Sequence, residues 1–198
     1  MVVGRPKQFD PDAAVDAAME VFWRKGYAGT TPQDLVDELG IGKGSLYATF
    51  GSKRALFDRA LERYRQQQGD ALTRVVEQPG PVKDRLRAAL QLILEANAAD
   101  PDRRGCLAVN TAAELGGVDL GATLDVRRMF ERNQGVLRAV IAEGQRTGQI
   151  RQDIAANALA AHLLATGAGL QVLVKTVQDL RELAPVVEAA VESLSPPA

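Results

Sequence analysis

Cysteine, histidine and aromatic residues are scarce in this chain of 198 residues. It contains one cysteine, one histidine and one tryptophan, and aromatic side chains make up 5% of the sequence. A lone cysteine excludes an internal disulfide and suits a reducing compartment. Cys106 and His162 have no third group at a recognisable spacing, and no cluster of metal-ligand residues occurs. We therefore expect no catalytic site, no metal site and no cofactor.

An excess of charge and a long apolar run are also lacking. The formal net charge is −1, and residues 1–69 hold 10 basic against 9 acidic side chains, so a nucleic-acid surface would depend on how the charges are arranged. The start "MVVGRPKQ" lacks the apolar core of a secretory signal, which predicts a cytoplasmic protein. The most apolar stretch, residues 158–174, is short for a membrane span and contains polar side chains, so no membrane association is expected.

Strand signals are almost absent, whereas alanine and leucine recur at helical spacing through most of the chain. We therefore predict an all-α protein of about nine helices. The stretch "FDPDAAVDAAMEVFWRKG" has Asp10 as an N-cap, Pro11 at the first helical position and Gly26 as its end. Residues 1–51 are predicted to form a three-helix head. A long helix over residues 52–77 joins it to a larger helical body, residues 52–198.

The segment "GIGKGSLYATFGSK", residues 40–53, contains a glycine-rich turn between two short helical patterns. Glycine permits a tight turn and Ile41 can fill its corner, which predicts a helix-turn-helix with an exposed second helix. Such a helix places its N-terminal residues against base edges in the major groove of DNA. The Gly-x-Gly-x-Gly run also suggests a nucleotide-binding loop. That interpretation is disfavoured because the preceding segment is helical and the Walker A spacing is not matched.

Side chains of this second helix suit contacts with duplex DNA. Lys43 supplies positive charge, and Gly44 allows the main chain to approach a phosphate. Ala48 and Thr49 can meet a thymine methyl group, and Thr49 can also form a hydrogen bond with a base. The Tyr47 hydroxyl suits a phosphate oxygen, with a role as a core aromatic as the alternative.

Two flanking segments add further basic residues. Lys53 lies in the first turn of a helix capped by Ser52, where the helix terminus already favours an anion such as a phosphate. Arg5 and Lys7 belong to the tail "GRPKQ", which could reach a minor groove or could be a solvated chain end.

The stretch "TTPQDLVDELGIGKGSLYATFGSKRALF" resembles the DNA-binding helix-turn-helix of the TetR (tetracycline repressor) family, and the resemblance extends from Phe9 to about Tyr64. It implies a sequence-specific transcriptional regulator. The resemblance also implies that Thr31 and Tyr47 contact phosphates and that Lys43, Gly44 and Ser45 lie at the groove. It further implies that Ala48 and Thr49 face bases and that Lys53 clamps the DNA backbone. The chain departs from the family pattern at Gly42, where a capping Ser or Thr is usual, and at Gly51, where proline is frequent.

The body is expected to bind a small effector. Phe130 is the only aromatic residue beyond Tyr64, so a small or aliphatic effector is predicted rather than a flat aromatic one. Candidate contacts on the apolar faces of the body are Asn97, Asn110, Thr111, Met129, Phe130, Asn133, His162 and Thr166. Each of these could instead be a hydrogen-bonded residue of the core.

Cys106 opens a helix just after Arg103 and Arg104, a setting that would lower the pKa of its thiol. The segment "GCLAVNTAAELG" also resembles one found in a TetR branch with members that respond to oxidants or electrophiles. Cys106 is therefore a candidate sensor of thiol modification. The alternative is a small buried packing residue.

Small residues in the penultimate helix, among them Ala160, Ala161, Gly167 and Gly169, allow close helix approach. With the last helix they predict a four-helix interface in a homodimer. The two DNA-recognition helices of such a dimer would lie about 34 Å apart, or a multiple of that distance. They would therefore require a palindromic operator in double-stranded DNA. The sequence thus favours a repressor released by an effector or by thiol modification. An enzyme and a purely protein-binding helical adaptor are the rival classes.

Overall fold

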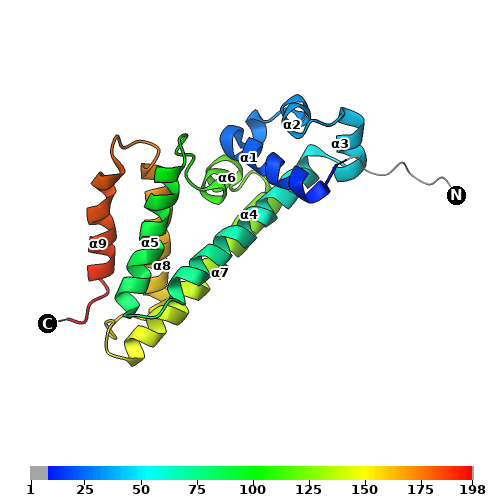
Figure 1. Cartoon of the computed structure of the whole chain (residues 1–198). Helices are drawn as coiled ribbons and strands as arrows, with labels where there is room; N and C mark the ends of the chain where they lie inside the picture. Colours follow the sequence, from blue (N-terminus) through cyan, green and yellow to red (C-terminus); the bar gives the residue numbers. More distant parts are fainter. Residues whose placement is uncertain (1–8, 198) are drawn as a thin grey trace. The chain divides into compact units, whose positions relative to one another are not determined.

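The computed structural model describes residues 9–197. Nine α-helices and one 3₁₀ helix occur in this range, and no strand is found within it (Figure 1). The α-helices are α1 Pro11–Gly29, α2 Pro32–Leu39, α3 Lys43–Phe50, α4 Lys53–Val76, α5 Val82–Ala99, α6 Leu107–Leu115, α7 Leu120–Arg146, α8 Ala156–Leu173 and α9 Ala184–Glu192, with the 3₁₀ helix at Leu180–Leu183. The predicted all-α fold is confirmed. Arg5 and Lys7 lie outside the described residues.

The contacts divide the chain into two units, Met1–Arg65 and Gln66–Ala198, and the division falls inside α4. In the first unit, the ring of Phe22 meets Phe57 edge-on with 5.0 Å between centroids, and Trp23 meets Tyr64 at the same distance. These pairs hold the first half of α4 against α1. Helices α2 and α3 are eight residues long, too short to be stable alone in water. They are held by packing, because Leu35 and Leu46 are fully buried.

Capping residues set the beginnings of α1 and α2 as predicted. The Asp10 side chain accepts a hydrogen bond from the backbone N–H of Asp12, and Pro11 is the first residue of α1. The predicted end at Gly26 coincides with a break in the helical geometry of α1. Gly26 adopts φ 73° and ψ 174°, which breaks the helix, but the chain resumes helical geometry to Gly29.

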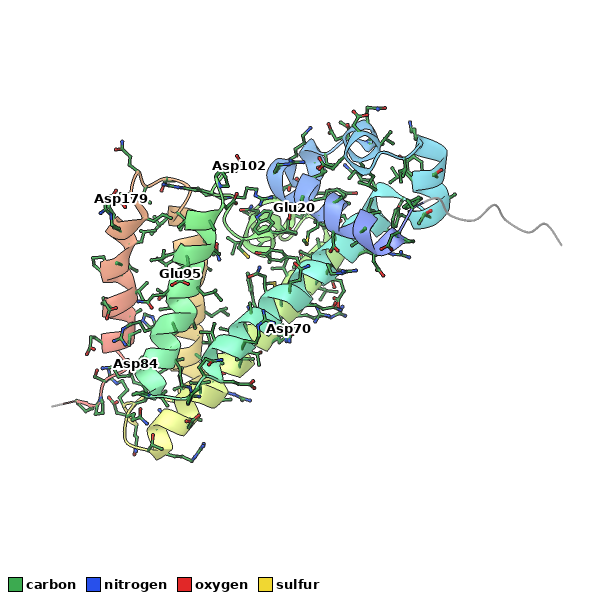
Figure 2. The ribbon with its side chains drawn as sticks, in the orientation of Figure 1. Glu20, Asp70, Asp84, Glu95, Asp102 and Asp179 are labelled. Carbon is green, nitrogen blue, oxygen red and sulfur yellow. The ribbon has the colours of Figure 1, made fainter. Side chains whose placement is uncertain are left out.

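In the second unit, α7 packs along α8, and α5 packs against both α8 and α9 (Figure 1). The core of this bundle contains Leu86, Ile141, Leu163 and Val191, all almost fully buried. Among the acidic residues of this unit, Asp70, Asp84 and Glu95 are exposed on helices and Asp102 is exposed in the loop after α5 (Figure 2).

One close approach in this core requires glycine. A Cβ atom at Gly144 of α7 would lie 2.4 Å from Cγ1 of Ile150 and 2.9 Å from Cγ1 of Val82. The missing side chain lets the chain fold back after α7 and places Ile150 in the core.

Candidate nucleic-acid interface and ligand cavity

Helix α3 buries one side and exposes the other. Leu46 and Phe50, one turn apart, are buried, whereas Lys43, Gly44, Ser45 and Ala48 are exposed. Tyr47 and Thr49 are half-buried. The four exposed residues were predicted to meet the groove or the bases, whereas Thr49, also predicted to face bases, is half-buried.

The beginning of α3 offers uncompensated backbone donors. Gly42 is its N-cap and supplies no side-chain hydrogen bond, so the first-turn N–H groups at residues 43–45 have no cap. A Cβ atom at Gly42 or Gly44 would meet nothing within 4 Å, which means that both residues face open space. Free N–H groups, the helix dipole and the neighbouring Lys43 together favour a phosphate at this end of the helix.

The turn before α3 depends on Gly40. This residue ends α2 in the left-handed region, with φ 62° and ψ 27°. Residues with a side chain are strained in this region, whereas glycine is not. The predicted helix-turn-helix is thus formed by α2, the turn at residues 40–42, and α3.

Lys53 is engaged inside the first unit. Its ammonium donates to the carbonyl oxygens of Tyr27 and Thr30, both at 2.9 Å, and lies 4.2 Å from the centre of the Tyr27 ring. Lys53 therefore neutralises the carbonyl end of α1 and ties it to the first turn of α4. An ammonium has three N–H donors, so one remains for a phosphate. The sequence around Lys53 gives no sign of this structural role, because the two acceptors are backbone atoms 26 and 23 residues earlier.

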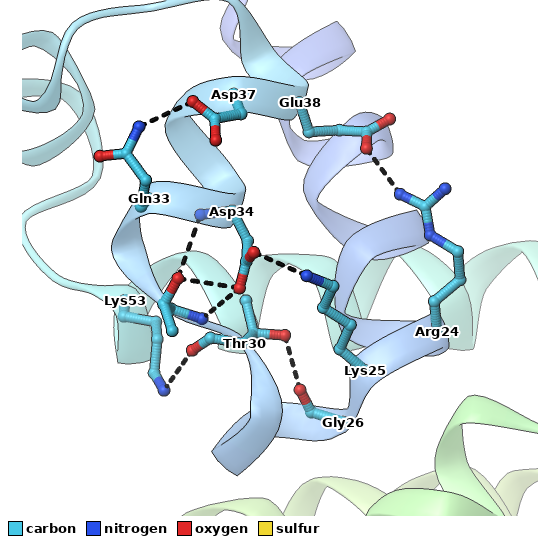
Figure 3. A network of polar contacts seen from close by, with 10 residues as sticks. Arg24, Lys25, Gly26, Thr30, Gln33, Asp34, Asp37, Glu38 and Lys53 are labelled. Atoms are coloured by element: carbon cyan, nitrogen blue, oxygen red, sulfur yellow. Dashed lines mark hydrogen bonds and ion pairs between the residues drawn. The ribbon is translucent and has the colours of Figure 1, made fainter.

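Thr31, a predicted phosphate contact, lies exposed at the start of α2. Figure 3 shows the ion pairs nearby, Lys25 with Asp34 and Arg24 with Glu38. The Thr31 hydroxyl accepts from the Asp34 N–H, and the Thr31 backbone N–H donates to Oδ2 of Asp34 at 2.8 Å, which together form a capping box. The hydroxyl also donates to Oδ2 of Asp34 at 2.8 Å. Asp34 also accepts a hydrogen bond from Lys25 at 2.6 Å. The pKa of Asp34 is lowered from its ordinary 3.8 to about 2. The hydrogen bond from Lys25 is the largest cause, and the bonds from the backbone N–H and hydroxyl of Thr31 add to it. A second ion pair, Arg24 with Glu38 at 2.6 Å, also joins α1 to α2.

The second unit contains a partly open cavity of about 120 Å³ between α4, α5, α7, α8 and the start of α6. Most of its wall is aliphatic. Four of the predicted effector residues line it: Cys106, Met129, Phe130 and Asn133. Two further polar residues, Gln68 and Gln171, also line it and were not predicted, because nothing in their local sequence shows which way their side chains turn.

The other predicted effector residues lie around the cavity rather than in its wall. Asn97 is buried, accepts from the N–H of Gly105 at 3.1 Å and donates to Oε1 of Gln171 at 3.3 Å. Asn110 accepts from Lys175, and Thr111 is buried in α6. His162 is exposed on α8, and the Thr166 hydroxyl donates to the His162 carbonyl.

Cys106 is the N-cap residue of α6 and is 6% exposed. The two preceding arginines have partners elsewhere. Arg104 pairs with Asp100 at 3.0 Å, and Arg103 donates to the carbonyl of Val177 at 2.8 Å. The thiol therefore borders the apolar cavity, and both guanidinium groups are committed to other contacts.

Two family models match the chain. Residues 14–60 match the bacterial regulatory proteins of the tetR family, and residues 82–190 match the tetracyclin repressor-like C-terminal domain. The chain belongs to the TetR family. YezE, an uncharacterized HTH-type transcriptional regulator of Bacillus subtilis (strain 168), is 33% identical over 97% of this chain and 100% of its own length. The HTH-type transcriptional repressor DhaR of Mycobacterium sp. (strain GP1) is 29% identical over 92% of this chain and 90% of its own.

Solved structures agree with this assignment. A cysteine mutant of the TetR family regulator CifR, complexed with a 26-base-pair double-stranded operator DNA, has a TM-score of 0.83 at 29% identity. The match covers 96% of this chain and 100% of that chain. With the exposed α3, these similarities identify a DNA-binding transcriptional regulator.

The turn after α3 depends on Gly51. This residue adopts φ 79°, a conformation that suits glycine and is closed to proline, whose ring fixes φ near −65°.

Helices α8 and α9 of this TetR-family chain leave an apolar face exposed. Within the described residues, α8 is the one helix long and apolar enough to cross a membrane by length and composition, and 28% of it is buried inside the chain. Its exposed residues include Ala161, Ala165, Val172 and Leu173, and Val186 is exposed on α9.

Proposed function

We propose that this chain is a homodimeric repressor that binds a palindromic operator in the cytoplasm and leaves it when a small effector binds or Cys106 is modified. The observation that carries the DNA-binding part is the exposed N-terminal half of α3, with Lys43, uncapped N–H groups and open space at Gly44. The name of DhaR as a repressor and the operator DNA bound to CifR support repression as the outcome.

Fluorescence anisotropy on duplex DNA from upstream of the protein's own gene tests this part. Lys43→Ala should weaken binding several-fold on every operator variant and lower the slope of log K against log salt by about 1.8, because the homodimer loses two phosphate contacts worth about 0.9 each. The control is Arg127→Ala, since Arg127 is 71% exposed on α7, far along the chain from the motif. Equal binding by the parent and Lys43→Ala at all salt concentrations would contradict the assigned interface.

The apolar face of α8 and α9 supports the dimer. Val172 is 51% exposed, Leu173 42% and Val186 37%. The small residues Ala161, Ala165 and Gly169 are also exposed on α8 and would permit a close approach of helices. Exposed apolar side chains on packed helices are typical of an interface between subunits. A second copy of the chain would cover it through a four-helix contact.

Light scattering coupled to size-exclusion chromatography tests the dimer. Ala165→Arg should yield a folded monomer with greatly reduced operator binding, because a charge would be buried in the contact. Ala96→Arg is the matched control, since Ala96 is exposed on α5. A dimeric Ala165→Arg protein would place the interface elsewhere.

The cavity supports the effector part of the proposal. It is lined by Gln68 and Leu72 of α4, the helix that starts at Lys53 directly after the motif. An effector that shifts α4 would change the distance between the two α3 recognition helices of a dimer. A coupling of about 2.7 kcal/mol would weaken operator binding about a hundredfold.

Thiol modification is tested by treating the protein with N-ethylmaleimide before adding operator DNA. The alkylated parent should lose operator affinity, because the added group enters a buried wall of the cavity. Cys106→Ser should bind DNA and be insensitive to the reagent. Undiminished binding by fully alkylated parent protein would leave Cys106 as a packing residue.

A further inference from the structure

Most basic side chains of the first unit are neutralised by carboxylates. Within residues 9–65, those that form ion pairs are Arg24, Lys25, Arg54, Arg63 and Arg65. Lys53 has no carboxylate partner but donates to two backbone carbonyl oxygens. Lys43 and Arg59 are therefore the basic residues of this range whose charge meets neither a carboxylate nor a carbonyl of the described chain.

Arg59 is exposed on α4, and the carboxylates nearest to it along the helix are bound to other arginines. Asp58 pairs with Arg54 at 2.6 Å. Glu62 stands one turn after Arg59, a spacing at which ion pairs are common, but it accepts two hydrogen bonds from Arg65 instead. The N–H donors of Arg59 therefore remain available for a ligand.

The ring of Phe50 holds Arg59 at the end of α3. The guanidinium carbon lies over this ring, 5.5 Å from its centre, and Phe50 is the last residue of α3. A guanidinium placed on an aromatic face keeps the edge with its N–H groups free, and a side chain already held in place loses less entropy on binding. A phosphate fits such an edge well, because two parallel N–H groups can meet two of its oxygens.

Lys43 and Arg59 thus mark the two ends of α3. Lys43 is the first residue of the helix, and its eight residues span about 12 Å at a rise of about 1.5 Å each. The major groove of B-DNA is about 12 Å wide and is bordered by the phosphates of both strands. A helix of this length in the groove would bring a cation at each end within reach of phosphates.

We infer that Arg59 is a second phosphate contact of the DNA-binding unit, at the C-terminal end of α3. This inference rests on the proposed function of α3 as the helix that enters the groove. It assigns a DNA contact to a residue outside the helix-turn-helix formed by α2 and α3.

The salt dependence of binding tests the inference, by fluorescence anisotropy on duplex DNA from upstream of the protein's own gene. Arg59→Gln should weaken binding several-fold and lower the slope of log K against log salt by about 1.8, because a homodimer loses two contacts worth about 0.9 each. Arg74→Gln is the matched control, since Arg74 is exposed on the same helix about four turns further along, and it should keep the parent's slope. An Arg59→Gln protein with the parent's slope would overturn the inference.

Arg59→Lys separates the charge of the residue from its packing on Phe50. Lysine keeps the charge but lacks the planar group, so this variant should retain the salt slope of the parent. Both Arg59 variants should unfold close to the parent's urea midpoint, followed by the fluorescence of Trp23 in the same unit. A slope for Arg59→Lys as low as that of Arg59→Gln, or a large drop in the midpoint of Arg59→Gln, would make Arg59 a structural residue and contradict the inference.

Lys43→Ala measured in parallel separates this inference from the proposed function. The double variant Lys43→Ala/Arg59→Gln should lower the slope by about 3.6, because the two contacts are separate. A reduced slope for Lys43→Ala with an unchanged slope for Arg59→Gln would disprove the role of Arg59 alone. A parent protein that shows no salt-dependent binding to the duplex would disprove the proposed function itself.

Discussion

Replacing Lys53 with methionine should destabilise the first unit, although the residue resembles a surface DNA contact in sequence. The ammonium donates to two carbonyl oxygens at 2.9 Å and lies 4.2 Å from the Tyr27 ring centre. A hydrogen bond from a charged donor contributes about 1.5–3 kcal/mol, and a cation–π contact at an exposed site about 0.5–1 kcal/mol. Because Lys53 is half-buried and water can replace part of these contacts, we expect a loss of about 2–3 kcal/mol.

Urea denaturation followed by tryptophan fluorescence measures this loss in the relevant unit. Trp23 is the single tryptophan of the chain and packs against Tyr64 in the first unit, so it reports on unfolding there. Lys43→Met is the matched control, since Lys43 is exposed and should change stability by less than about 0.5 kcal/mol. A Lys53→Met protein as stable as this control would refute the structural role of Lys53 and leave it as a DNA contact only.

Two further predictions concern acid stability and close packing. The pKa of Asp34 lies below its ordinary value, so its ionised form stabilises the fold above pH 3.8, and that contribution is lost as the pH falls from 3.8 towards 2. Asp34→Asn should therefore lose stability less steeply than the parent in an acid titration followed by circular dichroism. An equally steep loss of stability in the variant would argue against the bond between Asp34 and Lys25. Gly144→Ala should lower stability by about 1–3 kcal/mol because its Cβ would overlap Ile150. Gly135→Ala on the same helix has open space and should be neutral or stabilising by up to about 1 kcal/mol, so similar melting temperatures for the two variants would contradict the packing argument.

Local signals predicted the head well. Asp10 with Pro11, and Thr31 with Pro32, mark the beginnings of α1 and α2, because capping and the fixed φ of proline act within a few residues. Gly26 shows the limit of such signals. Glycine permits the break in α1, but the chain resumes helical geometry beyond it, where Thr30 donates to the Gly26 carbonyl.

The cavity was harder to predict, because it depends on which face of each helix turns inward. His162 and Thr166 are one turn apart on α8 and lie outside the cavity wall, whereas Leu163 and Gly167, each one residue further along, line it. A rotation of one residue on an apolar helix separates the two outcomes, and α8 is apolar on nearly every side. Polarity alone therefore could not select the residues of the wall.

In the proposed complex, Thr49 of α3 reads a base edge and Tyr47 holds a phosphate. The most direct test is the sequence preference of variants at these two positions, measured on a library of randomised duplexes. Thr49→Ala should change the preferred bases at one position of each half-site, whereas Tyr47→Phe should weaken binding to all sequences about equally and leave the preference intact. An unchanged preference for Thr49→Ala together with an altered one for Tyr47→Phe would contradict the account.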